Sequence, residues 1–268
     1  MFLLGVMHMK IKSMLVIGLC CIGTFTFAQT DQIQQDEPKL GIEFDATWAS
    51  KYIWRGMDLY DDHAAFQPSI NFDLFGTGFS VNVWESSACG SGFVSSDELD
   101  YTVTYQNSVF NDSKLQTDYS LSWLYYDYFR ISSDEADSQE FNMSLSWPNA
   151  CPVITPTYTI SYLYAAKGSS PASSLEMEGF AHILGFTYDC NIPETDLPLT
   201  FSWDITYNDG QGDSSIDHDW SHITWGLSTG IDFGPGRFTP AVYYQTSMDS
   251  SVNNEDEFWT TLSYTLSF

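Results

Sequence analysis

The residues of this chain that could do chemistry are carboxylates spaced along segments that alternate between apolar and polar residues. Seven of them take the polar positions of their segments: Glu43, Asp45, Asp73, Asp100, Asp118, Asp204 and Asp232. Two basic residues, Lys51 and Arg55, take the same kind of position. If these positions face an enclosed interior, the charges must be paired or wet. The surplus of carboxylates predicts either an acidic, water-filled path that favours cations, or a charged network that closes a narrow interior, with Lys51 and Arg55 tying neighbouring strands.

The elements that would position these residues are β-strands. In the last segment, Phe258 to Phe268, apolar and aromatic residues occupy one parity and mostly hydroxyl residues the other. This period of two is typical of a strand, and a stretch of about 9–11 residues suits a tilted strand that crosses a bilayer. About twelve segments alternate in this way: 40–56, 66–75, 78–86, 97–107, 115–126, 139–148, 153–164, 178–190, 197–208, 219–233, 236–247 and 257–268. They predict an all-β fold, an up-and-down antiparallel transmembrane β-barrel.

The N-terminus predicts export. Lys10 and Lys12 precede an apolar run that ends in Thr26-Phe27-Ala28, which is the pattern of a signal peptide cleaved after Ala28. We expect a signal peptide at 1–28, a periplasmic linker at 29–39 and a barrel at 40–268. No later run is apolar enough for a membrane helix, so a membrane-spanning form would have to be a closed barrel.

The connections between segments alternate in length. Tight turns at 76–78, 148–152 and 234–235 alternate with longer polar loops, as in bacterial barrels with short periplasmic turns and long outer loops. This places the chain in the bacterial outer membrane, in contact with its lipid. The formal charge of −26 becomes −28 once Lys10 and Lys12 are removed, which argues against nucleic acid as a partner.

Acidic residues gather in the longer loops. They keep exposed loops solvated, and clusters such as Asp213, Asp217 and Asp219 also offer hard oxygen ligands for divalent cations. The spacing does not match an EF-hand loop, so we assign no metal site and no cofactor. No His-x-Ser sequence occurs on any predicted strand. The four mature histidines are few, and the sequence predicts a protein that is not an enzyme.

Three cysteines remain after the signal peptide, Cys89, Cys151 and Cys190. Cys151 precedes the segment 153–164 and Cys190 ends the next, 178–190. Neighbouring antiparallel strands bring such positions together at one rim, about 5 Å apart. The periplasm is oxidising. The sequence therefore predicts a disulfide between Cys151 and Cys190 unless a shift in register separates the sulfurs.

The stretch from Ser50 to Gly56 resembles the N-terminal signature of the TorF family of porins. The matching positions are Ser50, Tyr52, Arg55 and Gly56, followed by a short acidic loop and a strand that opens near Pro68. The resemblance implies an outer-membrane barrel and a channel, and it carries no catalytic residues.

Together these patterns predict a porin-like channel for passive diffusion of small polar solutes, with a preference for cations. The alternative is a non-conducting barrel whose acidic loops bind partners or divalent cations. A third possibility is a soluble secreted β-protein that turns its apolar faces inward. A homo-oligomer is compatible with all of them.

Overall fold

The computed structural model describes residues 39–93, 96–133, 135–166, 177–195 and 197–268. The expected signal peptide, and all of the expected linker except Lys39, lie outside them. The regular elements are the strands β1 Gly41–Ala49, β2 Ile53–Trp54, β3 Met57–Asp58, β4 Ala65–Asp73, β5 Phe79–Ala88, β6 Glu98–Val109, β7 Thr117–Asp127, β8 Ser138–Ser146, β9 Thr155–Ala165, β10 Gly179–Asn191, β11 Pro198–Asp209, β12 His218–Ser228, β13 Ile231–Phe233, β14 Gly236–Ser247 and β15 Glu257–Ser267. None of the described residues forms a helix that is long and apolar enough to cross a membrane.

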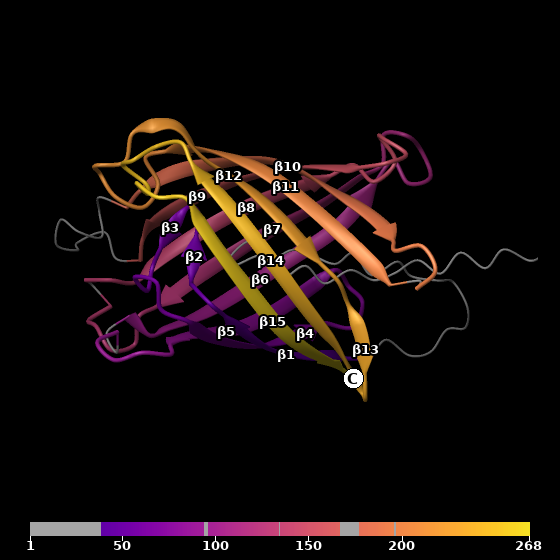
Figure 1. The fold of residues 1–268 in the computed structure, drawn as a ribbon, viewed down its shortest axis with the longest axis horizontal. Coiled ribbons are helices and arrows are strands. Elements are labelled where there is room, and N and C mark those ends of the chain that lie inside the picture. The colour runs from indigo at the N-terminus through magenta and orange to yellow at the C-terminus, as the bar shows by residue number, and fades with distance from the viewer. Residues whose placement is uncertain (1–38, 94–95, 134, 167–176, 196) are drawn as a thin grey trace, which may run out of the picture.

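Twelve of these strands form one closed antiparallel wall (Figure 1). Each pairs with its neighbours in chain order, β1 pairs with β15, and β12 pairs with β14. The ring has no free edge, because the first and last strands close it. The predicted twelve-stranded barrel is therefore confirmed. β13 continues the line of β12 after a break and pairs with the first residues of β14.

The alternation in the sequence sorts side chains between the two faces of the wall. Large apolar residues cover the outside, where Leu121 and Phe141 are about half exposed. Hydroxyl and amide side chains face inward, and Ser120, Ser161 and Thr261 are buried. Apolar groups outside and polar groups inside invert the arrangement of a soluble protein, as expected of a barrel in the bacterial outer membrane.

The two ends of the barrel differ. The short turns lie at one end of the barrel. The start of β1 and the end of β15 lie at the same end, where Phe268 N–H donates to the carbonyl of Ile42. The turn after β4 is one example: Gly76 and Gly78 have φ of 63° and 86°, and Gly76 N–H donates to Asp73. β2 and β3 lie at the other end, away from the C-terminus (Figure 1). The predicted alternation of short and long connections is present.

Two predicted segments differ from the structure. The first wall strand was expected over 40–56 but ends at Ala49, and the chain then turns away from the wall. The segment 219–233 is interrupted after Ser228, and its last part, β13, pairs with β14 alone among the described strands.

The cysteines give a test of orientation. Cys89 is exposed at the end with the long loops, whereas Cys151 lies in a short turn at the other end. We expect a membrane-impermeant maleimide to label a variant that keeps only Cys89 on intact cells. A variant that keeps only Cys151 should react only after the outer membrane is permeabilised. Labelling in the reverse pattern would contradict short turns on the periplasmic side.

The predicted disulfide stays a prediction. Cys151 and Cys190 are both free thiols in the structure. Cys151 lies four residues before β9, and Cys190 pairs with Leu199 on β11. Hydrogen bonds from the backbone N–H groups of Ile154 and Val153 lower the pKa of the Cys151 thiol. Counting thiols in denatured, unreduced protein distinguishes one free thiol from three.

Candidate functional site

Residues 50–64 fold back into the barrel and are called here the inner hairpin. β2 and β3 pair within it, and Leu59 N–H donates to the carbonyl of Tyr52 at 2.9 Å. The turn between them uses Arg55 and Gly56, with φ of 46° and 93°. The value at Gly56 is one that residues with a Cβ rarely adopt. The local sequence therefore allows a tight turn where a wall strand would otherwise continue.

The inner hairpin contacts two different parts of the wall. On one side Tyr52, Trp54 and Tyr60 pack in an apolar cluster with Tyr126 of β7 and Leu163 of β9. On the other side Ile53 packs with Ala241, Tyr243 and Trp259, from β14 and β15. The hairpin thus crosses the interior of the barrel and fills part of its cross-section.

Arg55 anchors the tip of the inner hairpin. Its Nη2 lies 2.6 Å from Oε1 of Glu140 on β8, and its Nη1 donates to Gln211. The Glu140 side chain is 0% exposed. Gln211 in turn donates to Ser161 on β9 at 2.7 Å. A buried carboxylate needs such a partner, because an uncompensated buried charge costs several kcal/mol.

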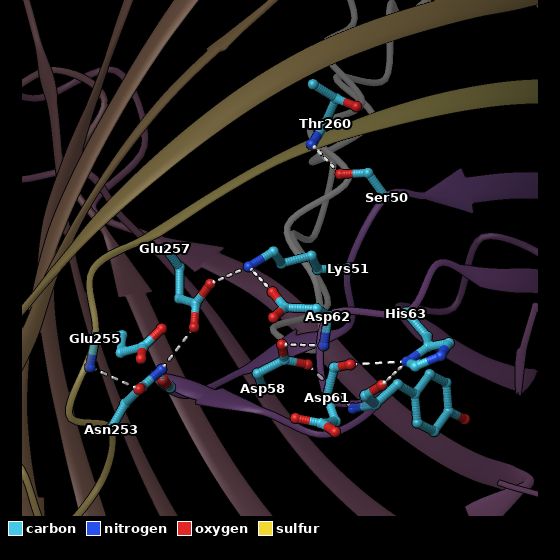
Figure 2. Close-up of polar contacts among 12 residues, drawn as sticks. Ser50, Lys51, Asp58, Asp61, Asp62, His63, Asn253, Glu255, Glu257 and Thr260 are labelled. Carbon is cyan, nitrogen blue, oxygen red and sulfur yellow. Dashed lines mark hydrogen bonds and ion pairs between the residues drawn. The ribbon is translucent and has the colours of Figure 1, made fainter. Parts of the chain in front are cut away.

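Lys51, Asp62 and Glu257 form an ion-pair group at the base of the inner hairpin, called here the latch. Figure 2 shows the Lys51 ammonium between the two carboxylates. Its Nζ lies 2.7 Å from Glu257 at the start of β15. Asn253 donates to the other oxygen of Glu257 at 3.0 Å (Figure 2). It also donates to the carbonyl of Gly56 at 2.9 Å. The latch therefore joins the hairpin to the last strand.

Asp58 lies beside the latch, and with Asp62 and Glu257 it forms a group of three carboxylates of the kind that binds metal ions. Ligand atoms of Asp58, Asp62 and Glu257 lie within 4.8 Å of one another. The Asp58 carboxylate, however, accepts the backbone N–H groups of Tyr60 and Asp62, and Lys51 already supplies the positive charge. We therefore assign the group to anchoring and not to metal binding. Among the described residues it is the only such group, so Asp213, Asp217 and Asp219 do not form one.

The charges of the latch are stable at neutral pH. Burial lowers the pKa of Lys51, but its hydrogen bonds and charge interactions with Asp62 and Glu257 outweigh that effect and raise the pKa overall. The hydrogen bond and charge of Lys51 lower the pKa of Asp62 below its ordinary value of 3.8. The contribution of Asp62 to stability is therefore present above that value, and it is lost as the pH falls through the lowered pKa.

A small cavity lies against the inner hairpin. It measures about 40 Å³ and is lined by Ile53, Arg55, Gly56, Ile183, Asp204, Thr206, His222, Thr224, Gln245 and Trp259. These residues come from the hairpin and from β10, β11, β12, β14 and β15. The cavity holds a few water molecules at most.

A larger hollow of about 550 Å³ lies elsewhere. Its lining is almost entirely apolar and includes Val103, Leu121, Phe141, Met143 and Phe180. These side chains are on the outer face of the wall, and all five are 38–54% exposed. The hollow therefore faces lipid, and it is not a site for a polar solute.

A family of bacterial proteins matches residues 36–265 of the chain. It is described as "Bacterial protein of unknown function (Gcw_chp)". The chain belongs to this family. No curated protein matches the chain significantly. The match covers the whole wall except the last few residues of β15, so the barrel and the inner hairpin are both parts of the family's domain.

Solved structures resemble the barrel. The NanC porin has a TM-score of 0.50 at 12% identity, with 84% of this chain and 98% of that chain covered. The KdgM porin has a TM-score of 0.49 at 10% identity, over 84% and 99%. An outer membrane channel from Pseudomonas putida F1 has a TM-score of 0.43 at 10% identity, over 89% and 100%. The likeness to NanC supports the fold, and the TorF resemblance stays a prediction.

The predicted site residues fall into separate places. Glu43 accepts from Ser267 and Asp73 from Gly76 N–H near the short-turn rim. Asp45 accepts from Thr47 and Thr265, and Asp118 from Ser108 and Gln116. Asp100 and Asp204 lie on the inner face of β6 and β11.

Three predicted positions need correction. Lys51 and Arg55 were expected on a wall strand, tying neighbouring strands. They belong to the inner hairpin instead, because β1 ends at Ala49, and they connect it to the wall. Asp232 was expected inside the barrel, but its side chain is 88% exposed and pairs with Arg237 at 3.4 Å. It lies on β13, beyond the end of β12, so it faces solvent at the rim.

Three buried acidic residues that contact the inner hairpin were not predicted from the sequence. Glu98, Glu140 and Glu257 are at most 5% exposed, and each contacts the inner hairpin. Glu98 accepts from Tyr52 Oη at 3.0 Å. Each begins a strand or lies close to its start, so each resembles a loop residue in the sequence. Their shared parity with inward residues, such as Glu98 with Asp100, is the signal that could have found them.

One serine and one histidine lie within hydrogen-bond distance. Ser221 Oγ is 2.9 Å from His222 Nδ1, but Ser221 donates its own proton to the carbonyl of Thr206. His222 therefore donates to Ser221, which is the reverse of a base that activates a nucleophile. This pair gives no catalytic geometry, and the expectation of a protein that is not an enzyme stays a prediction.

Proposed function

We propose that the chain is an outer-membrane channel through which small polar solutes diffuse passively, with a preference for cations. The observation that carries this proposal is the charge of the interior. Lys51 and Arg55 are both paired with carboxylates. Asp45, Asp118 and Asp204 add further inward carboxylates. An interior with surplus negative charge attracts cations and repels anions.

The inner hairpin sets the size of the solute. It contacts opposite parts of the wall, and the cavity beside it has room for only a few atoms. A path that passes this constriction suits inorganic ions and very small polar molecules. Larger solutes would require the hairpin to move.

The test is the reversal potential of the purified chain in a planar bilayer across a potassium chloride gradient. We expect cation preference in the unmodified chain. Neutralising Asp45, Asp73 and Asp118 together with asparagine should move the reversal potential toward zero, because it removes three carboxylates while keeping side-chain size.

Asp112→Asn is the matched control. Asp112 lies exposed in the turn after β6 with φ of 60°, a conformation that asparagine also tolerates. It should leave the reversal potential unchanged. An equal shift in both variants would mean that general surface charge, and not the interior, sets selectivity. Anion preference in the unmodified chain would refute the proposal.

The second candidate function is a barrel that does not conduct and that binds partners or divalent cations through its acidic loops. The many buried contacts of the inner hairpin favour it, because they would hold the interior closed. Absence of conductance in a folded, membrane-inserted chain would support this candidate over the channel.

A further inference from the structure

The cavity beside the inner hairpin contains a carboxylate without a protein partner. Asp204 faces it from β11, and no hydrogen bond or ion pair to Asp204 is found among the described residues. Its neighbours across the strands are Gly185 and Thr224. A Cβ on Gly185 would come within 3.2 Å of Asp204 Cβ, so the glycine leaves space at the carboxylate. A partnerless carboxylate in a confined site is costly unless something neutralises it.

The other lining groups supply neutral oxygen atoms. Thr206 and Thr224 bring hydroxyl groups from β11 and β12. Gln245 donates its Nε2 to the carbonyl of Gly56 at 2.9 Å, so its Oε1 remains an acceptor. Carboxylate, hydroxyl and amide oxygens are ligands of hard cations.

The charges around the cavity leave one negative charge to balance. Arg55 also lines it, but its guanidinium is paired with Glu140 at 2.6 Å. His222 donates through Nδ1 to Ser221. It forms no ion pair with a carboxylate among the described residues, so nothing there favours a charged imidazole. A single carboxylate with neutral oxygens matches one monovalent charge, whereas a calcium site uses six to eight oxygens and usually several carboxylates.

The cavity also holds an unused donor. Trp259 is 4% exposed, lines the cavity, and its Nε1 has no hydrogen-bond partner. A cation cannot accept that hydrogen bond, but a water molecule that coordinates the cation can. The volume of about 40 Å³ is sufficient for an ion with one or two waters.

We propose that Asp204, Thr206, Thr224 and Gln245 form a binding site for a monovalent cation with its remaining water. The inner hairpin covers the site through Ile53 and Gly56. The site gives the proposed cation preference a place where the ion binds. Only the role of the site in selectivity rests on the proposed channel function. Binding itself does not require conduction.

The experiment is anomalous diffraction from crystals of the full mature chain soaked in a series of rubidium chloride concentrations. We expect a rubidium peak within hydrogen-bond range of Asp204. Asp204→Asn should weaken binding about tenfold or more, because it removes the only unpaired charge of the site. Asp189→Asn is the matched control, since Asp189 of β10 accepts from Thr200 and does not line the cavity, and it should keep the peak.

The outcomes separate the two proposals. No peak in the unmodified chain, or equal occupancy in Asp204→Asn, would overturn the site even if the channel prefers cations. A peak in a chain that does not conduct would retain the site and refute the channel. If Asp204→Asn fails the heat-modifiability test for folded barrels, Thr224→Val, which removes one hydroxyl, takes its place and should lower the occupancy. Unchanged occupancy in Thr224→Val would count against the site.

Discussion

Replacing Arg55 with methionine is expected to lower the free energy of unfolding by about 3–5 kcal/mol. Methionine keeps much of the side-chain length but leaves Glu140, which is 0% exposed, without its cation. The measurement is equilibrium unfolding by urea in phospholipid vesicles, followed by tryptophan fluorescence. The same variant should raise single-channel conductance, because Arg55 holds the tip of the inner hairpin to β8.

Two further variants identify the cause of that loss. Arg130→Met removes an ion pair with Asp97 in which the arginine side chain is 48% exposed, and it should cost at most about 1 kcal/mol. The double variant Arg55→Met, Glu140→Gln should recover much of the stability, since it removes the uncompensated charge. If the double variant were no more stable than Arg55→Met, the buried charge would not be the cause.

Gly56→Ala should also weaken the inner hairpin, by about 1–3 kcal/mol for the backbone alone. Gly56 has φ of 93°, and an added Cβ would lie 2.6 Å from His222 Nδ1 and 3.0 Å from Val252. Both the backbone and the contacts oppose the substitution. Urea unfolding measures the loss, and bilayer recording should detect more frequent or larger openings.

Gly76→Ala is the control for this substitution. Gly76 also has a positive φ of 63°, but nothing lies within 4 Å of an added Cβ. It should cost only about 1 kcal/mol, the penalty of the left-handed conformation. Equal losses in the two variants would show that the contacts of Gly56 with His222 and Val252 contribute nothing.

The wall was predictable from the sequence, because a barrel in lipid imposes a strict period of two on every strand. Leu121 and Phe141 face outward and Ser120 faces inward, as the alternation required. The ends of strands were predictable at turn residues such as Gly76 and Gly78, because glycine readily adopts the positive φ that a tight turn requires.

The inner hairpin was not predictable in the same way. Tyr52 and Trp54 continue the alternation of β1. An aromatic side chain can face lipid, face the barrel interior or pack inside a hairpin, so the sequence alone does not place these two in the hairpin cluster. Arg55 was recognised as inward, but its partner Glu140 is 85 residues away, and no local pattern joins them. Asp232 was misplaced because alternation continues across the break after Ser228. Contacts between distant strands decide these cases, and a local period carries no information about them.

The latch has a consequence for the order in which the molecule assembles. Lys51 and Glu257 are 206 positions apart, and Gly56 is joined to Gln245 and Asn253, 189 and 197 positions later. The inner hairpin is synthesised early and has partners on β7 to β9, but the partners of its base are in the last strands to emerge. The latch can form only when β15 is in place, after most of the cost of forming long-range contacts has been met. We therefore expect the base of the hairpin to be fixed late in folding, when the last strand joins the wall.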